Sequence, residues 1–489
     1  MFEVELSLNT LLVSIEHIFA GGVAALEHIL FFSLYDLPLI IGWLLVGAVF
    51  LTFRMGFINI RGFIHGCLIT LGRYDDSDMP GEATHFQALA TALSATVGLG
   101  NIAGVAIALQ MGGPGAILWM TLVGFLGMTS KFVECTLAQQ YRIIQPDGHI
   151  LGGPMYYLSL GLSELGLKPL GRLLAVSFAG FCLFSSLGGG NLFQANQSSL
   201  LISTLGQSFW GGAVSDYRWI YGVALALTVG LVIIGGFQRI ARVSSVIVPL
   251  MAGLYLLAAL WIVSLHLDAV PTAIQTVWQS AWHPQAVEGG IIGVLVQGLR
   301  RGVGSNEAGL GPAAIAHAMA RTQEPIREGL VAMLEPFIDT VVICNLTALV
   351  CLVTGVYQDT ELDGITLTLA AFTQEIPLMS WGLGFIAILF SFSTIVSWFY
   401  YGETSWRYLF GDRGLWSYKL LYTSCVFIGT VISLQAILTF GDMMKFCMGV
   451  PSMTGAILLS NQVAQKLADY NKRLPSFNSL PRVTEAAPD

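Results

Sequence analysis

The hydrophobic residues of this chain fall into long continuous runs that are separated by short polar connections. A run of about 18 or more mostly apolar residues is long enough for an α-helix to cross a bilayer. Because the runs do not alternate residue by residue, they exclude a transmembrane β-barrel. The pattern predicts an all-α polytopic membrane protein with eleven transmembrane helices, at residues 37–56, 86–111, 114–140, 172–203, 218–237, 244–265, 287–318, 330–354, 379–409, 417–438 and 443–465.

The two ends of the chain differ from these runs. Residues 7–33 are apolar but contain four titratable side chains, Glu16, His17, Glu27 and His28. Such groups make a full crossing costly, so we expect residues 1–36 to form an interfacial helix or a helix packed on the bundle. Residues 468–489 are polar and contain prolines, which predicts a disordered tail.

Composition and charge agree with a multi-pass protein of the plasma (inner) membrane. Hydrophobic residues make up 55% of the chain and charged residues only 11%, whereas soluble domains carry about 25% charged residues. Alternate connections hold most of the Lys and Arg, and the intervening ones hold only Arg218 and Lys445. The positive-inside rule therefore places the N-terminus outside and the C-terminus in the cytoplasm. Nothing in the charge pattern indicates a nucleic-acid partner, and the spacing of the seven cysteines indicates neither a disulfide framework nor a metal site.

Two glycine-rich segments stand inside predicted spans. "GLGNIAG" covers residues 98–104 and "GVGSNEAG" covers residues 302–309, and each has a G-x-G core, a following Asn and a later Ala-Gly. Each segment begins a block of five predicted spans, residues 86–270 and residues 287–465. Five is an odd number, so the two blocks must cross the membrane in opposite directions, which predicts an inverted repeat.

Paired interruptions at matching positions of two repeats are typical of transporter binding sites. Unwound backbone is tolerated at membrane depth only where it meets protein or lines a cavity. The N–H groups at the start of a half-helix attract an anion, and the carbonyl groups at its end attract a cation. We therefore expect a ligand that brings an anion and a cation together. The alternative is that the glycines serve close helix packing, which needs no matched Asn.

Several motifs resemble the alanine or glycine:cation symporter family, also called sodium:alanine symporters. They are "HFQALATALSATVGLGNIAGVA" at 85–106, "GGPMYYL" at 152–158, "SNEAGLG" at 305–311 and "STIVSWFYYGE" at 393–403. The resemblance extends from about Phe53 to Ser460. It implies the neurotransmitter-symporter-like fold, with two inverted five-helix repeats and one extra helix in front. Here the extra helix and a basic cytoplasmic loop would occupy residues 37–85.

The resemblance implies sodium-coupled uptake of a small neutral amino acid of the alanine or glycine class. It assigns substrate contacts to two broken segments and two further helices, at Thr96, Gly98, Gly100, Asn101, Gln194, Gly302, Val303, Gly304, Asn306 and Trp398. It assigns the sodium ion to carbonyls near Ala95 and Gly98 and to the hydroxyls of Ser393 and Thr394. Oxygen ligands of this kind suit a hard cation. Each assignment has an alternative: the hydroxyls could bond within their own helix, Gln194 could join two helices, and Trp398 could face lipid.

Two residues beside the second segment prompt further hypotheses. The family usually has Phe before "SNEAG", where this chain has Gly304. The extra room suggests a substrate larger than alanine, of serine or glutamine size. Glu307 is expected to support the unwound segment by accepting backbone or Asn N–H bonds. Lys131 and Glu134 lie three residues apart on the third span and can pair on one face.

Other classes of function find less support in the sequence. The chain has neither an H-E-x-x-H metalloprotease motif nor a G-x-x-x-x-G-K-[ST] phosphate loop, and we find no Ser–His pair suited to an intramembrane protease. It is therefore predicted not to be an enzyme, to need no cofactor other than sodium as coupling ion, and not to use ATP directly. A proton-coupled carrier, an amino-acid channel and a sensor on the same fold stay as alternatives.

Overall fold

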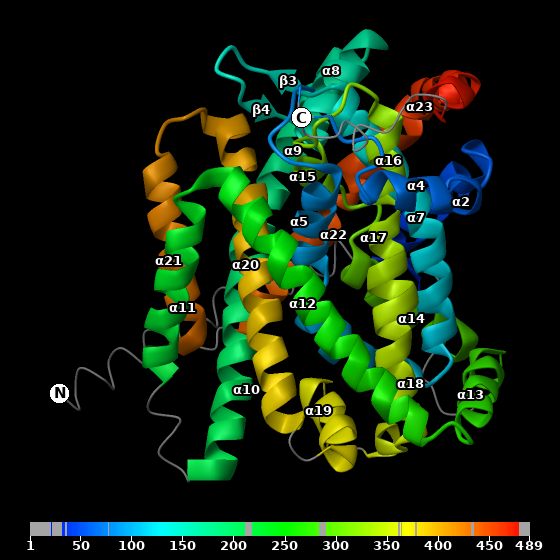
Figure 1. Cartoon of the computed structure of the whole chain (residues 1–489), viewed down its shortest axis with the longest axis vertical. Coiled ribbons are helices and arrows are strands. Elements are labelled where there is room, and N and C mark those ends of the chain that lie inside the picture. The colour runs from blue at the N-terminus through cyan, green and yellow to red at the C-terminus, as the bar shows by residue number, and fades with distance from the viewer. Residues whose placement is uncertain are drawn as a thin grey trace, which may run out of the picture.

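The structure is a computed structural model and describes residues 21, 32–34, 37–76, 78–210, 218–282, 290–359, 362, 364–376, 379–431 and 435–478. It is a bundle of helices with two very short antiparallel strand pairs (Figure 1). The helix predicted at residues 7–33 lies almost entirely outside the described residues.

The first part of the chain forms a strand pair followed by helices that lie against the bundle. Gly47 of α2 approaches Met453 of α23 so closely that a Cβ there would lie 2.4 Å from the sulfur atom. The elements of this part are β1 (Ser33–Leu34), β2 (Leu37–Pro38), α2 (Leu39–Arg54), α3 (Ile58–Arg61) and α4 (Phe63–Thr70).

The first predicted repeat coincides with the helices from α5 to α12. Its members are α5 (His85–Thr96), η1 (Gly100–Gly104), α6 (Val105–Gly112), α7 (Ala116–Gln140), β3 (Ile143–Ile144), β4 (Ile150–Leu151), α8 (Pro154–Glu164), α9 (Lys168–Leu187), η2 (Gly188–Leu192), α10 (Phe193–Trp210), α11 (Arg218–Ile233) and α12 (Gly236–Leu265). The segments η1 and η2 are π-helical. Helix α13 (Val270–Trp282) connects this part to the next.

The second predicted repeat coincides with the helices from α14 to α23. Its members are α14 (Gly290–Asn306), α15 (Ala313–His317), α16 (Pro325–Ala332), α17 (Leu334–Pro336), the π-helical η4 (Phe337–Cys344), α18 (Asn345–Val353), η5 (Val356–Gln358), α19 (Gly364–Glu375), α20 (Met379–Phe410), α21 (Leu415–Val431), α22 (Gln435–Cys447) and α23 (Gly449–Asn478).

Helix α23 continues past the predicted end of the bundle. The expectation of a disordered tail from residue 468 is wrong for residues 468–478, which are helical. The physical reason is packing: Tyr470 is buried, and its hydroxyl lies 2.7 Å from Nε2 of His65. Arg473 also pairs with Glu324. Residues 479–489 lie outside the described part.

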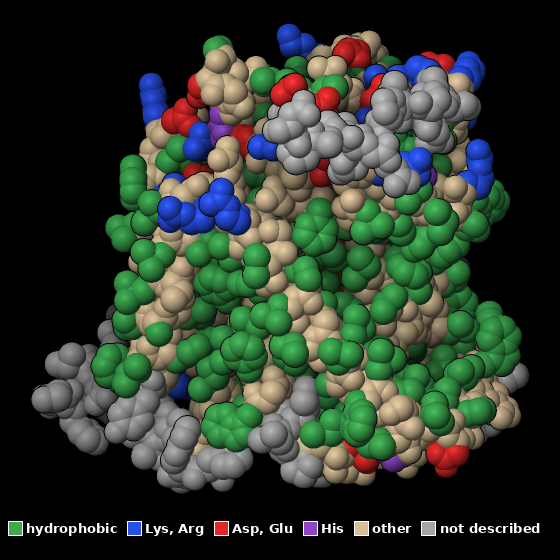
Figure 2. Space-filling view, in the orientation of Figure 1, with side chains coloured by type: hydrophobic (Ala, Val, Ile, Leu, Met, Phe, Trp, Pro, Cys, Tyr) green, Lys and Arg blue, Asp and Glu red, His purple; other side chains and the backbone are tan. Residues whose placement is uncertain are grey.

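The outer surface of the bundle is suited to lipid. On the face that Figure 2 shows, hydrophobic side chains cover the middle of the molecule, and Lys and Arg gather at the end where α8 lies in Figure 1. Six helical stretches in the described chain are long and apolar enough to cross a membrane, and the bent pair of α5 with η1 and α6 adds a seventh. Helices α2 and α11 are shorter apolar helices of 16 residues each.

Candidate binding cavity

The first predicted interruption is present in α5 and α6. Thr84 starts α5 with a capping box, in which its hydroxyl accepts from Gln87 N and its own N–H donates to the Gln87 side chain. The helix ends at Thr96 because Val97 takes an extended conformation. The chain then turns by 56° into the π-helical segment η1 and α6. Gly98 has no room for a side chain, since a Cβ would lie 2.9 Å from Thr394 Oγ1.

The second interruption lies within the glycine-rich segment 302–309, but the expectation that the helix breaks at Gly302 is wrong. Residues 302–306 belong to α14, and the break follows Asn306. Gly302 serves helix packing, because a Cβ there would lie 2.4 Å from Val123 of α7. Val303 is buried in the core. The helix ends because Glu307 adopts a left-handed conformation, with φ of 56°, and its N–H donates to Val303 O.

One polar network joins the two interruptions. Asn101 Oδ1 accepts a hydrogen bond from Gly98 N at 2.9 Å, which fixes the first break. Asn101 Nδ2 donates to Asp339 Oδ1 at 2.6 Å and to Ser305 Oγ at 3.1 Å. Ser305 in turn donates to Asp339 Oδ2 at 2.7 Å. Asp339 is fully buried on η4, so its carboxylate holds the ends of both broken segments together.

Asn306 fixes the second break in the same manner as Asn101 fixes the first. Its Oδ1 accepts from Ala308 N at 2.9 Å, and its Nδ2 donates to Thr340 Oγ1 at 2.9 Å. Both asparagines are fully buried. The matched Asn in the two glycine-rich segments thus has a matched structural role, although Asn306 is not among the residues that line the cavity.

A cavity of about 490 Å³ lies where the two interruptions face each other. The lining residues come from both breaks and from the helices beside them. They are Ala95, Thr96, Gly98, Gly100, Ala103, Gly104, Ile107, Gly189, Phe193, Gln194, Gln197, Arg300, Arg301, Gly304, Ser305, Trp398, Thr439, Met443, Lys445 and Phe446. The predicted residues Ala95, Thr96, Gly98, Gly100, Gln194, Gly304 and Trp398 are thus brought together at one cavity. Gly302 and Val303 are not among its lining residues.

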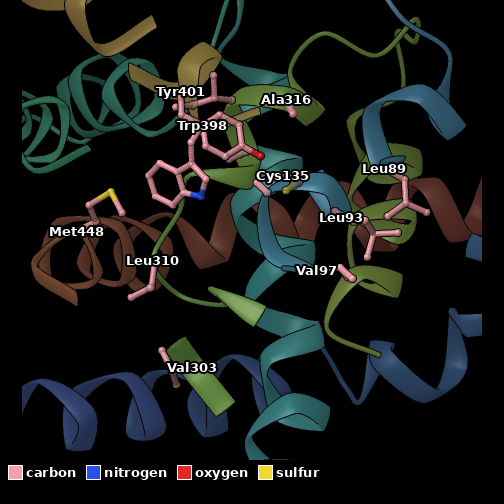
Figure 3. Close-up of a cluster of buried hydrophobic side chains, with 14 of the residues drawn as sticks. Leu89, Leu93, Val97, Cys135, Val303, Leu310, Ala316, Trp398, Tyr401 and Met448 are labelled. Atoms are coloured by element: carbon pink, nitrogen blue, oxygen red, sulfur yellow. The ribbon is translucent and has the colours of Figure 1, made fainter. Parts of the chain in front are cut away.

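Gln194 and Trp398 both line the cavity. The side-chain oxygen of Gln194 is buried near Gly98 and has no hydrogen-bond partner among the described residues. Trp398 is nearly fully buried and its ring lies 5.4 Å from that of Tyr401 (Figure 3). Gly190 of η2 allows this position, since a Cβ there would lie 2.4 Å from Trp398 Cγ. Trp398 is therefore a cavity residue and does not face lipid.

The residues predicted to hold sodium lie where α5 ends against α20. Thr394 Oγ1 donates across to Ser94 O at 3.0 Å, and Ser94 Oγ donates back to Ser393 O at 2.8 Å. The hydroxyl of Ser393 donates to Phe390 O within its own helix at 3.0 Å. Thr394 thus faces the first break, whereas the alternative of a bond within the helix describes Ser393 in this structure.

Glu307 has a different partner from the one expected. Its Oε1 lies 2.6 Å from Nζ of Lys445 on α22, and Lys445 also donates to Gly304 O at 2.8 Å. The carboxylate therefore supports the second break through a lysine. The predicted pair of Lys131 with Glu134 does not form in the structure. Lys131 pairs with Glu335 at 3.0 Å, and Glu134 accepts a hydrogen bond from Ser452 at 2.7 Å.

The end of the bundle near the N-terminus of α5 is closed by contacts between the two repeats. Ala83 pairs with Ala320 in an isolated parallel bridge. Arg142 donates to four backbone carbonyls on both sides of this bridge, those of Pro80, Ala318, Ala320 and Thr322, at 2.6 to 2.8 Å.

A fully buried carboxylate adds to this closure. Glu328 of α16 accepts from Nδ1 of His85 and from Nδ1 of His317, the latter at 2.5 Å. The three side chains join α5, α15 and α16. Among the described residues, no group of three or more His, Cys, Asp or Glu side chains is arranged to hold a metal ion.

The sequence did not single out several of these residues. The sequence shows that Asp339 is a charged residue inside a predicted span, which is a sign of a functional or structural role. It does not show its partners Asn101 and Ser305, because these lie in other helices. Lys445 was assigned to a connection between predicted spans, whereas in the structure it belongs to α22. Ser305 was visible inside the second segment, next to the residues that were selected.

A helical bundle with two interrupted helices around a polar cavity at its centre is the architecture of a secondary transporter. Comparison of the sequence with known families identifies the family of transporters. The model of the sodium:alanine symporter family matches residues 23–483, and the chain belongs to that family. It is therefore a multi-pass membrane protein of the cation-coupled amino-acid symporter class, and it is not an enzyme.

Named relatives and a solved structure agree with this class. The chain is 38% identical to the sodium/alanine symporter AgcS of Methanococcus maripaludis, over 89% of this chain and 94% of that protein. It is 35% identical to the amino-acid carrier protein AlsT of Bacillus subtilis, over 91% and 93%. The crystal structure of MhsT in complex with L-phenylalanine has a TM-score of 0.52 at 15% identity, and covers 79% of this chain and 89% of that one. MhsT thus supports the neurotransmitter-symporter-like fold.

Proposed function

We propose that the protein imports a neutral amino acid together with sodium by alternating access. The observation that carries this proposal is the cavity at which the break after α5 meets the end of α14. The backbone at that point offers both signs of partial charge. N–H groups at the start of the η1 and α6 segment attract a carboxylate, and carbonyl groups at the ends of α5 and α14 attract cations.

The substrate would lie along the first break. Its carboxylate would meet the backbone from Gly98 to Asn101, where Gly98 and Gly100 let a ligand approach closely. The side-chain oxygen of Gln194 would accept a hydrogen bond from the substrate ammonium group, and its present lack of a partner among the described residues supports this role. Trp398 would cover the opposite side.

Sodium would bind beside the substrate, between α5 and α20. Its ligands would be carbonyl groups near Ala95 and Gly98, and the hydroxyl of Thr394. Ser393 would contribute if its hydroxyl turned away from Phe390 O. A ligand set of carbonyl and hydroxyl oxygens suits a hard monovalent cation without a carboxylate.

The space at Gly304 supports a substrate larger than alanine, of serine or glutamine size. A Cβ at this position would find only Phe446 within 4 Å, at 3.7 Å. The wall of the cavity is therefore open at Gly304, whereas Gly302 packs on Val123 and does not line the cavity.

We further propose eleven transmembrane helices in two inverted repeats, with the N-terminus outside and the C-terminus in the cytoplasm. The gathering of Lys and Arg at the end where α8 and α23 are labelled in Figure 1 supports this orientation (Figure 2). The closure formed by Arg142, Glu328 and the Ala83–Ala320 bridge would then be the cytoplasmic gate, and it would open to release the substrate.

Uptake into proteoliposomes tests the proposal. An imposed inward sodium gradient should drive accumulation of serine or alanine above equilibrium, and an inward proton gradient alone should not. Accumulation with the proton gradient instead would favour the proton-coupled alternative. Counterflow separates a carrier from a channel, and binding without any flux would indicate a sensor.

A further inference from the structure

The opening at Gly304 has a charged donor at its edge. Lys445 Nζ lies 2.8 Å from Gly304 O, so the ammonium group and the missing side chain share one corner of the cavity. Both residues line the cavity. The side chain of Lys445 is 17% exposed, and the nearby ring of Trp398 has its centroid 5.9 Å from Nζ.

The ammonium group has donor capacity left for a ligand. A lysine carries three N–H donors. Among the described residues, Lys445 donates to Gly304 O and pairs with Glu307 Oε1, the latter at 2.6 Å. The fully buried carboxylate of Glu307 lies against the ammonium group, so the formal charges of the two groups cancel at this corner. A substrate that reaches this corner therefore gains from an accepting oxygen and does not need a net negative charge.

We propose that Lys445 sets substrate specificity by donating a hydrogen bond to an oxygen in the amino acid's side chain. This inference rests on the proposed function and names its substrate class: amino acids with a hydroxyl or carboxamide group that fits the space at Gly304. Serine and glutamine belong to this class, whereas alanine and aliphatic amino acids leave the donor without a ligand partner.

The competing account is purely structural. Lysine side chains commonly bond the last carbonyl groups of a helix, and Lys445 does so at the end of α14. If that were its whole role, amino acids of equal size would be transported alike with or without a side-chain oxygen. The two accounts therefore predict different ratios of kcat/KM between amino acids of equal size with and without a side-chain oxygen. This ratio does not depend on the total transport activity.

The experiment compares pairs of amino acids of similar size in sodium-driven uptake by the full-length protein. The pairs are serine with 2-aminobutyrate and glutamine with norleucine, and glutamate tests whether a charge is preferred. A hydrogen bond to a charged group predicts that the wild type prefers the oxygen-bearing member by about tenfold or more in kcat/KM. Glutamate should not exceed glutamine.

Variants assign the preference to the lysine. The double variant Lys445→Met with Glu307→Gln avoids a buried unpaired carboxylate, and it should lower both ratios toward one. Lys445→Arg keeps a donor and should retain the preference. Wild-type ratios near one, or ratios that the double variant leaves unchanged, would overturn the inference while the proposed function stands. Absence of any sodium-driven uptake by the wild type would instead count against the proposed function. If the double variant does not fold, the single variant Lys445→Gln takes its place, and ratios equal to those of the wild type would overturn the inference.

Discussion

Asn101 is one of the residues that join the two halves of the molecule. The G-x-G-N pattern made Asn101 visible in the sequence, and its hydrogen bond to Gly98 N explains why an Asn follows the glycines. Its partner Asp339 could not be inferred, because the two residues are 238 positions apart. A local sequence pattern therefore predicts where a helix is interrupted. The buried groups that stabilise the interruption, such as Asp339, come from other helices and become visible only in the folded structure.

Replacing Asn101 with Ala should destabilise the protein. The change removes donors from the buried carboxylate of Asp339, which costs about 1–3 kcal/mol when a buried polar group loses its partner. Thermal unfolding in detergent measures the loss. Asn471→Ala is the matched control, because Asn471 is exposed on α23. Equal losses in the two variants would contradict the role given to Asn101.

Thr394→Val should weaken the dependence of uptake on sodium. The variant keeps the shape of the side chain and removes the hydroxyl beside Gly98. We expect the sodium concentration for half-maximal uptake to rise about tenfold, as for the loss of one contact to a charged group. Thr394→Ser should restore the wild-type value. Ser393→Ala should have a smaller effect, because the Ser393 hydroxyl bonds within its own helix; a larger effect than that of Thr394→Val would reverse the assignment.

At the scale of elements, the sequence predicted two interrupted helices and misplaced the second interruption. Gly302 and Gly98 look alike in sequence, but Gly302 packs on Val123 and leaves the helix intact. The helix ends later, where Glu307, Gly309 and Gly311 take positive φ values. The sequence alone does not distinguish a glycine that allows close helix packing from a glycine that ends a helix. The difference depends on whether a neighbouring helix packs against the glycine.

If the closed end of the bundle must open during transport, a crosslink between the loops that contain Ala83 and Ala320 should stop uptake. Residues facing each other in a β-bridge have Cα atoms about 5 Å apart, within the range that a disulfide can span. Ala83→Cys with Ala320→Cys should therefore form a disulfide under oxidation, stop uptake, and recover uptake on reduction. Each single variant under the same oxidant is the control for the native cysteines. Normal uptake by the fully crosslinked protein would show that this end does not need to open.

At the scale of the whole molecule, the apolar runs predicted a helical membrane bundle, because lipid demands continuous apolar segments and these are visible in one dimension. In the described chain, six helical stretches and the bent pair of α5 with η1 and α6 are long and apolar enough to cross a membrane, and the count of eleven stays a prediction. The inverted arrangement was inferred from matched segments in blocks of five. The three π-helical segments and the buried Glu328 with its two histidines were not predicted. These features depend on contacts between helices that are far apart in the sequence. One amino-acid sequence contains no local pattern from which such contacts can be predicted.

The central claim is that the amino acid and sodium bind together where the two interruptions meet. Equilibrium binding of labelled serine to the purified protein, measured over a series of sodium concentrations, tests it most directly. Coupling of two ligands is reciprocal, so sodium should tighten serine binding by the same factor by which serine tightens sodium binding, and Thr394→Val should reduce both factors together. Serine affinity that does not change with sodium would contradict the account.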